Sequence, residues 1–336
     1  MCFWGSAAAA LLLCGAARSA EGPVAPPVTA LAFSPAGTAL LVGSQRGIEE
    51  RTWPALGKQR RIETSLRHVH DLAFAPSGKL FAAGGGKPAQ EGAIELFEWP
   101  PGTGVKSLVC HADLVMAVVF SADSRLLATA SHDRTVGVID PAGGKLLRRL
   151  EGHSRAVLAA AFLPGGTTLV TAGVDRSVRV WDAETGALLR ALENHTDAVL
   201  DLAATAALDA ESPARVVSVG EDRTLRFWEP DRGRLVRFAR LPATPLAVVW
   251  NSARRAAIAS CSDGKLRAVD FETAAVAVET AALEGLAYSI AVHPESGDCA
   301  VGGERGQLLR VALKAATRTS SAAEPRPTEH PPHRDS

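Results

Sequence analysis

The residues best suited to chemistry in this sequence are three equally spaced histidines. His111, His153 and His195 follow one another at intervals of 42 residues. An imidazole can ligate a metal, transfer a proton or join a buried hydrogen-bond network. The spacing places one histidine in each copy of a repeated unit, so the three side chains would face separate surroundings. We therefore expect each to be hydrogen-bonded locally, as buried polar groups usually are.

A second pair, His68 and His70, stands two residues apart, so both side chains would share one face of a strand. No pattern of Cys or carboxylate ligands completes a zinc site around them, and we predict no metal there. His330 and His333 lie in a polar tail and are expected to be solvated.

Recognisable catalytic motifs do not occur in the sequence. It contains no GxSxG, HExxH, P-loop or GxGxxG pattern. The glycine-rich run Gly84–Lys87 lacks the phosphate-loop spacing and leads into a predicted strand, so no helix N-terminus follows it. No cluster of acidic residues that could form an enzyme active site is recognisable. We predict no catalytic residues, no metal and no cofactor.

The elements that must position these residues form a repeat with a period near forty. One phrase returns as LAFSP, LAFAP, VVFSA and AAFLP, and its Phe33, Phe74, Phe120 and Phe162 lie 41, 46 and 42 residues apart. Degenerate copies are VLDLAAT, VVWNS and IAVHP, starting at positions 199, 248 and 290. Seven copies at this period, with four strands each, are typical of a β-propeller.

The fourth copy shows the internal pattern most clearly. Four short strands, AVLAAAF, TLVTAG, SVRVWD and ALLRAL, alternate with Pro-Gly-Gly, Val-Asp-Arg and Ala-Glu-Thr-Gly turns. The inner strands are almost wholly apolar, which fits sheets packed face to face.

SHDRTVGVID, GVDRSVRVWD and GEDRTLRFWE, with GH-like dipeptides upstream, resemble WD40 repeats over roughly residues 28–313. The resemblance implies an all-β, seven-bladed WD40-type β-propeller with four-stranded antiparallel blades. The sequence is similar in particular to exported bacterial WD40-repeat proteins.

The resemblance also implies a buried hydrogen-bond chain of His, Ser or Thr, Asp and Trp in each complete blade, which fixes the blade in one arrangement. Its members here would be His111, His153, His195, Asp133, Asp175, Asp222, Asp263, Trp181 and Trp228. Only blades four and five carry His, Asp and Trp together, and in blade three Ile139 replaces Trp. We predict that blades three to five are the most rigid and that the others depend mainly on apolar packing.

WD40 domains commonly bind peptides on the face that carries the turns between the second and third strands, here called the top face. These turns hold a basic residue in almost every blade: Arg46, Lys87, Arg134, Arg176, Arg223, Lys265 and Arg305. They would form a positive ring suited to an acidic peptide or an anionic polymer. The alternative is that they are ordinary solvated turn residues beside the structural aspartates.

Two insertions interrupt the repeat. Residues Lys87–Glu91 lengthen a top-face turn in blade two, and Leu208–Pro213 lengthen a connection of blade five on the opposite face. Such insertions often contribute to binding surfaces. Closure of the ring is unclear, because EGPVAPP before the first blade is poorly suited to strand pairing. We expect the last blade to lack a good fourth strand.

Residues 1–20 resemble a secretory signal peptide, with an apolar run from Ala7 to Gly15 and cleavage after Ser19. This run is too short to span a bilayer. No basic residue precedes it, so an uncleaved, cytoplasmic N-terminus is the alternative; Leu13 argues against lipidation at Cys14. The propeller is assigned to residues 21–315 and a disordered tail to 316–336.

The composition fits a globular chain of 336 residues, with 47% hydrophobic residues and a formal net charge of zero. This balance does not indicate a nucleic-acid or membrane-surface binder. After signal removal three cysteines remain, Cys110, Cys261 and Cys299, and no CxxC occurs, so we expect small buried side chains.

We therefore predict an exported, periplasmic or secreted, monomeric propeller. It would bind an unidentified protein or peptide partner, possessing no membrane span and no nucleic-acid site. Two alternatives are an exported enzyme that uses the central channel and a polyanion-binding sensor. Carboxylates that titrate in the channel would favour the enzyme, and strong salt dependence would favour the sensor.

Overall fold

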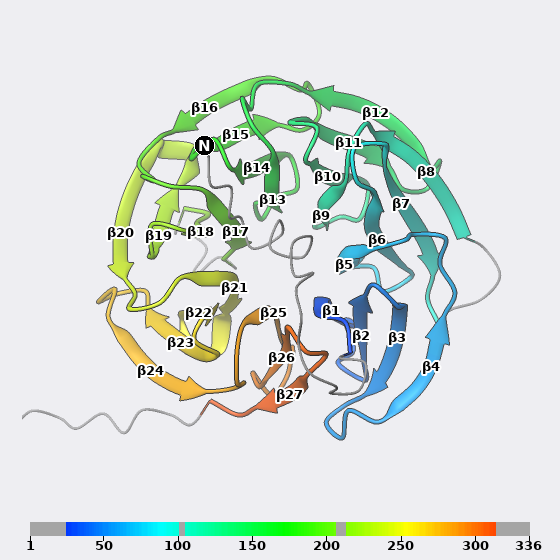
Figure 1. Cartoon of the computed structure of the whole chain (residues 1–336). Helices are drawn as coiled ribbons and strands as arrows, with labels where there is room; N and C mark the ends of the chain where they lie inside the picture. The colour runs from blue at the N-terminus through cyan, green and yellow to red at the C-terminus, as the bar shows by residue number, and fades with distance from the viewer. Residues whose placement is uncertain (1–24, 101–104, 206–212, 314–336) are drawn as a thin grey trace, which may run out of the picture.

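The computed structural model describes residues 25–100, 105–205 and 213–313. These residues form seven antiparallel sheets arranged as blades around a central axis (Figure 1). The predicted seven-bladed propeller is therefore confirmed. The predicted signal peptide, the predicted tail and most of the blade-five insertion lie outside the described residues.

The blades follow one another in chain order. Blade one contains β1 (Val28–Phe33), β2 (Ala39–Ser44), β3 (Gly47–Thr52) and β4 (Lys58–Ile62). Blade two contains β5 (Val69–Phe74), β6 (Leu80–Lys87), β7 (Glu91–Glu98) and β8 (Val105–His111). Blade three contains β9 (Val115–Phe120), β10 (Leu127–Ser131), β11 (Val136–Asp140) and β12 (Lys145–Leu150). Blade four contains β13 (Val157–Phe162), β14 (Thr168–Gly173), β15 (Val178–Asp182) and β16 (Leu188–Leu192).

Blade five contains β17 (Val199–Ala204), β18 (Val216–Gly220), β19 (Thr224–Glu229) and β20 (Arg234–Arg240). Blade six contains β21 (Pro245–Asn251), β22 (Ala256–Cys261), β23 (Lys265–Asp270) and β24 (Val276–Ala281). Blade seven has β25 (Ala287–Val292), β26 (Cys299–Gly303) and β27 (Leu308–Val311). Two short 3-10 helices, η2 (Pro230–Arg232) and η3 (Ser252–Arg254), lie in turns of blades five and six.

In every blade the first strand lies nearest the axis and the last strand lies on the circumference (Figure 1). The second strands are almost completely buried, as in β10, β18 and β22, because both of their faces pack against neighbouring blades. These strands accordingly read as continuous apolar runs. Leu41 and Phe81, from blades one and two, share one such inter-blade cluster.

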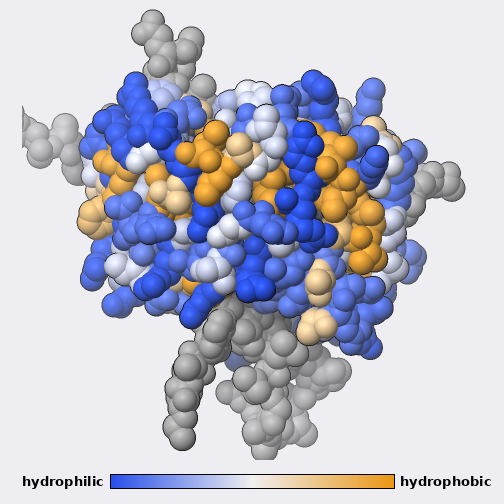
Figure 2. All heavy atoms as spheres, turned by 90° about the horizontal axis from the view of Figure 1, so that it is seen from above, coloured by the Kyte–Doolittle hydropathy of each residue, from blue (hydrophilic) through white to orange (hydrophobic). Residues whose placement is uncertain are grey.

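The outer strands have the opposite character. β16 exposes four of its five residues, and Figure 2 shows the rim as a mainly hydrophilic surface with separate apolar patches. Exposed large apolar side chains on these outer strands are Val109, Leu147, Leu188, Leu189, Phe238 and Val276. Isolated exposed apolar residues of this kind are normal on a folded protein.

Blade seven has three strands within the described part of the chain, as the sequence predicted. Blades seven and one do not share a hydrogen-bonded sheet, and contacts of side chains join them. Ser289 Oγ donates a hydrogen bond to Val28 O at 3.0 Å, and His293 Nε2 donates to Gly37 O at 3.0 Å. The His293 ring also stacks on Trp53, with ring centroids 5.4 Å apart. This seam closes the ring.

The blade-two insertion is an extension of one hairpin. β6 and β7 each reach eight residues and pair as far as Lys87 and Glu91, whose side chains form an ion pair at 2.7 Å. At the tip, the Ala89 N–H donates to Asp113 Oδ1 at 2.8 Å. The hairpin therefore leans on the loop before blade three.

The seam between blades seven and one can be tested with matched glycine substitutions. Gly37 and Gly78 occupy the β1–β2 and β5–β6 turns with the same φ of +68°. A Cβ on Gly37 would lie 2.5 Å from His293 Nε2, whereas a Cβ on Gly78 meets nothing closer than 3.8 Å. We expect Gly37→Ala to lower the free energy of unfolding by about 1–3 kcal/mol more than Gly78→Ala does. Urea unfolding measures both, and equal losses would show that the seam does not stabilise the ring.

Candidate functional site

Blade four contains a complete buried chain of polar side chains. Trp181 Nε1 donates to Thr171 Oγ1 at 2.8 Å, and Thr171 Oγ1 lies 2.8 Å from His153 Nε2. His153 Nδ1 lies 2.9 Å from Asp175 Oδ2. A neutral imidazole that accepts from the Thr171 hydroxyl at Nε2 and donates to Asp175 at Nδ1 satisfies every group in the chain.

Blade five repeats this arrangement with a serine. His195 lies 2.7 Å from Ser218 Oγ and 2.8 Å from Asp222 Oδ2, and Trp228 donates to Ser218 at 2.8 Å. Blade three has the first part only: His111 lies 2.8 Å from Thr129 and 3.0 Å from Asp133. Ile139, in the place of Trp, is fully buried.

The aspartates of these chains are held ionised. Burial alone would raise the pKa of Asp175, but the hydrogen bonds from His153, Ser177 and Ser154 hold the pKa well below its usual range. The corresponding partners, His111 and His195, lower the pKa values of Asp133 and Asp222 in the same way. Burial in turn lowers the pKa of His195, so this imidazole remains neutral near pH 7. Such a tightly satisfied set has a structural role.

Blades two and six, which were expected to depend mainly on apolar packing, also contain buried polar networks. In blade two, Ser65 stands where blades three to five have His. The buried Glu95 carboxylate accepts hydrogen bonds from Ser65 and from Thr64 Oγ1, the latter at 2.6 Å. In blade six, Arg267 is 1% exposed and pairs with Asp263 at 2.7 Å and with Glu279 at 2.8 Å. Asp263 thus forms an ion pair with Arg267, and no described histidine is its hydrogen-bond partner.

Six of the basic residues on the top face lie in or next to the turns between the second and third strands, where they occupy three different positions. Arg134, Arg176 and Arg223 occupy the last turn position, with φ of +73°, +67° and +58°. The same position holds glycine in blades one, six and seven, as Gly47, Gly264 and Gly306. Arg46 and Arg305 precede this position and Lys265 follows it. The basic residues of the predicted ring therefore do not occupy equivalent positions in all blades. The seventh basic residue, Lys87, ends β6 in the long hairpin.

Ion pairs further divide these basic residues. Lys87 pairs with Glu91 at 2.7 Å, Lys265 with Glu279 at 2.5 Å and Arg305 with Glu304 at 4.0 Å. The other four are exposed and form no ion pair with any described residue: Arg46, Arg134, Arg176 and Arg223. These four are the top-face cations that remain available to a partner.

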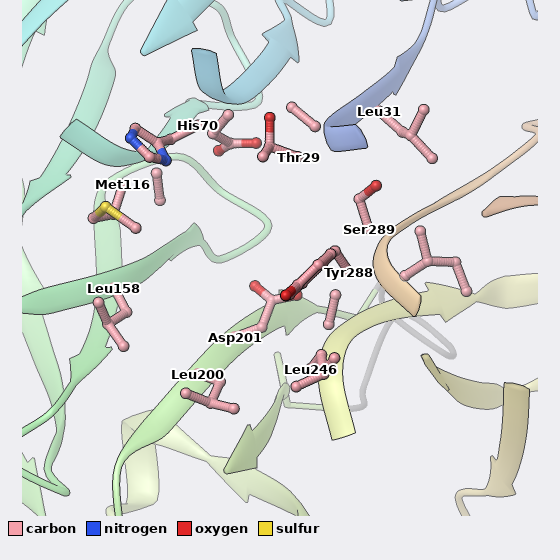
Figure 3. A pocket seen from close by; sticks show the side chains of 15 residues that line it. Thr29, Leu31, His70, Met116, Leu158, Leu200, Asp201, Leu246, Tyr288 and Ser289 are labelled. Carbon is pink, nitrogen blue, oxygen red and sulfur yellow. The ribbon is translucent and has the colours of Figure 1, made fainter. Parts of the chain in front are cut away.

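The first strands contribute a feature that the sequence analysis missed. Each has a β-bulge at its second residue, close to the top face, where the register against the second strand shifts. The bulged residues line the channel: Thr29, His70, Met116, Leu158, Leu200, Leu246 and Tyr288. Figure 3 shows their side chains around one common space, a cavity of about 210 Å³. The only sequence signal was their equal position within the repeat.

Comparison with known proteins agrees with this geometry. A family model described as WD domain, G-beta repeat matches residues 102–140, 144–182 and 186–229. Each matched segment begins near the outer strand of one blade and ends on the third strand of the next. The chain is a WD40-repeat β-propeller.

Two relatives extend the comparison. The chain is 33% identical over 118 residues to WD repeat-containing protein SL1-17 of Schistosoma mansoni, which is 35% of this chain and 38% of that protein. It is 41% identical over 44 residues to Coronin-2A of Bos taurus, which is 13% of this chain and 8% of that protein. The matches thus span less than two fifths of either relative. WD40 propellers are generally protein-interaction scaffolds without catalytic activity.

Two carboxyl groups line the channel of this WD40 propeller, and they bear on the enzyme alternative. Asp71 accepts hydrogen bonds from the N–H groups of Leu72 and Val118, both at 2.8 Å. Asp201 accepts from Leu202 at 2.8 Å and from Val248 at 2.7 Å. Val118 and Val248 belong to the next blade, so each carboxyl group ties two blades together. Because both oxygens of each group accept a backbone hydrogen bond, each carboxyl group has a structural role in joining adjacent blades.

Other groups that would support enzymatic or membrane functions are not apparent in the described parts of the chain. There, no cluster of three or more His, Cys, Asp or Glu side chains could hold a metal ion. Cys110, Cys261 and Cys299 are buried and free. No described helix is long and apolar enough to cross a membrane.

Trp181 provides a test of the polar chain in blade four. It is 2% exposed, so Trp181→Ala is expected to lower the free energy of unfolding by about 3–5 kcal/mol. Phe238 is 54% exposed on the rim, and Phe238→Ala should cost less than about 1 kcal/mol. Chemical denaturation measures both variants. A loss below about 1 kcal/mol for Trp181→Ala would contradict the assigned role.

The two channel carboxyls predict a specific pH dependence. Burial raises the pKa of Asp71 and Asp201 to about 7, although their backbone hydrogen bonds oppose the shift. The folded state therefore holds protons that the unfolded state releases above pH 4, and these groups destabilise the fold as pH rises from about 4 to 7. We expect Asp71→Asn to be least stable relative to wild type at about pH 4. The difference should shrink by about 1 kcal/mol per pH unit up to pH 7.

Thermal unfolding of both proteins in matched buffers measures this difference. Since the histidines with lowered pKa titrate equally in both proteins, their contribution cancels in the comparison. A difference that stays constant from pH 5 to pH 7 would show that the Asp71 carboxyl is not protonated in the folded protein.

Proposed function

We propose that this WD40 propeller is a non-catalytic platform whose top face binds an acidic segment of a protein partner. The observation that carries the proposal is the set Arg134, Arg176 and Arg223. All three are exposed and adopt the left-handed conformation, which costs a non-glycine residue about 1–2 kcal/mol.

The conformational strain at these three arginines supports a functional role. Three other blades carry glycine at the same turn position, so the fold accepts glycine there. Solubility alone does not require a charged residue at a strained site, because the adjacent turn positions are free of this strain. Conformational strain that a fold could avoid is typical of residues kept for binding. Together with Arg46 they present four cations on one face, and an arginine suits a bidentate contact with a carboxylate.

Export and a monomeric state are also part of the proposal. Export is supported by the apolar run from Ala7 to Gly15 and by the small residues that precede the expected cleavage after Ser19. A monomer is supported by the ring, which closes on itself through the seam between blades seven and one.

The test separates charge from stability. In the variant Arg134→Gly/Arg176→Gly/Arg223→Gly each substitution relieves backbone strain. We therefore expect the free energy of unfolding to rise by about 0.5 kcal/mol per site. Partner affinity should fall at least about tenfold, because charge-assisted hydrogen bonds are lost. A matched control removes three positive charges from the outer strands of blades three to five instead: Arg148→Ser/Arg190→Ser/Arg237→Ser.

Affinity purification with each full-length protein as bait, followed by mass spectrometry, identifies partners that are lost only with the top-face variant. Binding of one such partner is then measured by calorimetry at several salt concentrations. Equal retention by all three baits would contradict the proposal. Capture of anionic polymers, with affinity that falls steeply with salt, would instead favour the polyanion sensor.

A further inference from the structure

The channel lining divides into an apolar arc and a polar arc. Blades three to six contribute Met116, Leu158, Leu200 and Leu246, and the remaining blades contribute Thr29, His70 and Tyr288 (Figure 3). Since each of these residues is the bulged position of its first strand, this division arises from the side chains and not from the backbone. The ring of bulged residues is therefore chemically one-sided, although the first strand of blade five also contributes the Asp201 carboxyl to the lining.

A second hollow continues the apolar lining toward the opposite face. Leu31 and Ile290 line both spaces, and Phe33, Phe74, Val249 and Val292 line the second one. Apolar side chains thus extend from the bulges along the axis of the propeller. Exposed apolar surface in a concave site is the usual property of a small-molecule pocket.

The charges of the channel restrict what can bind there. The lining of the 210 Å³ cavity includes Asp71 and Asp201 and contains no Lys or Arg. Burial lowers the pKa of His70 to about 4, so its imidazole is neutral at pH 7. Its Nε2 is buried without a hydrogen-bond partner among the described residues. The site therefore disfavours an anion, and a ligand in the cavity does not reach the buried His70 Nε2.

We propose that the central channel is a binding site for an uncharged ligand of about eight non-hydrogen atoms, with an aliphatic body and one hydroxyl or similar head group. The size follows from cavities of about 150 Å³ that hold benzene. The aliphatic body packs on Met116, Leu158, Leu200 and Leu246, and the head group bonds to the Tyr288 hydroxyl. This site is independent of the arginines on the top face.

The sequence supplies two nearly unique reporters for the test. Tyr288 is the only tyrosine of the chain, and Met116 is one of two methionines, the other being Met1. The full chain is labelled with 3-fluorotyrosine and with methyl-¹³C methionine. It is then titrated with 1-hexanol, and separately with hexanoate at pH 7.5, while NMR records both signals. Met1 serves as an internal control.

We expect hexanol to shift the Tyr288 and Met116 resonances saturably in the millimolar range, and hexanoate to bind at least about tenfold more weakly because the channel offers no cation. Leu200→Asn should reduce hexanol affinity about tenfold, whereas the matched change Leu189→Asn on the rim should not alter it.

Absence of a saturable hexanol shift, or equal affinity for hexanoate, overturns the proposal. Circular dichroism checks the fold of Leu200→Asn; if that variant does not fold, the comparison of hexanol with hexanoate on the wild-type protein decides. The top-face variant with three glycines should bind hexanol normally. Failure of hexanol binding therefore leaves the top-face proposal intact, and loss of partner binding leaves the channel proposal intact.

Discussion

The contact between the last blade and the first is the constraint on which the rest of this structure depends. Each blade packs only against its two neighbours, so seven sheets form one cooperative unit only if the ring closes. Here no fourth strand joins blade seven within the described residues. Ser289, His293 and Trp53 provide the connection instead, through two hydrogen bonds to backbone carbonyls and a ring stack. A seam made of side chains is sensitive to shape, which is why a glycine must face His293.

Within the ring, buried polar groups are satisfied blade by blade in three different ways. Blades three to five use histidine and aspartate, blade two uses Glu95 with two hydroxyl groups, and blade six uses Arg267 with two carboxylates. Each solution gives its buried carboxylates hydrogen-bond donors, because an unsatisfied buried charge would be costly. The chemistry varies, but the requirement that it satisfies is the same in each blade. This freedom explains why the repeat is difficult to recognise outside blades three to five.

The two candidate surfaces differ in their electrostatics although they lie close together. The top face carries exposed arginines at strained turn positions, whereas the channel beneath it carries two buried carboxyls and no basic residue in its cavity lining. One backbone rule produces both surfaces. The second strand ends in the turn at the top face, and the antiparallel first strand begins beside it with a bulge. The turn residues on the top face are therefore often charged, whereas the bulged residues inside the channel are mainly apolar.

The sequence by itself determined the number of blades, their strand order, the incomplete last blade and the partners of His111, His153 and His195. These features depend on local patterns: apolar runs, turn residues and a regular period. Only the tertiary structure decided the roles of Glu95, Arg267, Asp71 and Asp201, the closure through His293 and the division of the channel into two arcs. The roles of Glu95 and Arg267 depend on strand register. The roles of Asp71 and Asp201 and the closure depend on contacts between blades more than 40 residues apart in sequence. A shift of register by one residue turns a side chain to the other face of its sheet, and no local pattern in a single chain determines that choice.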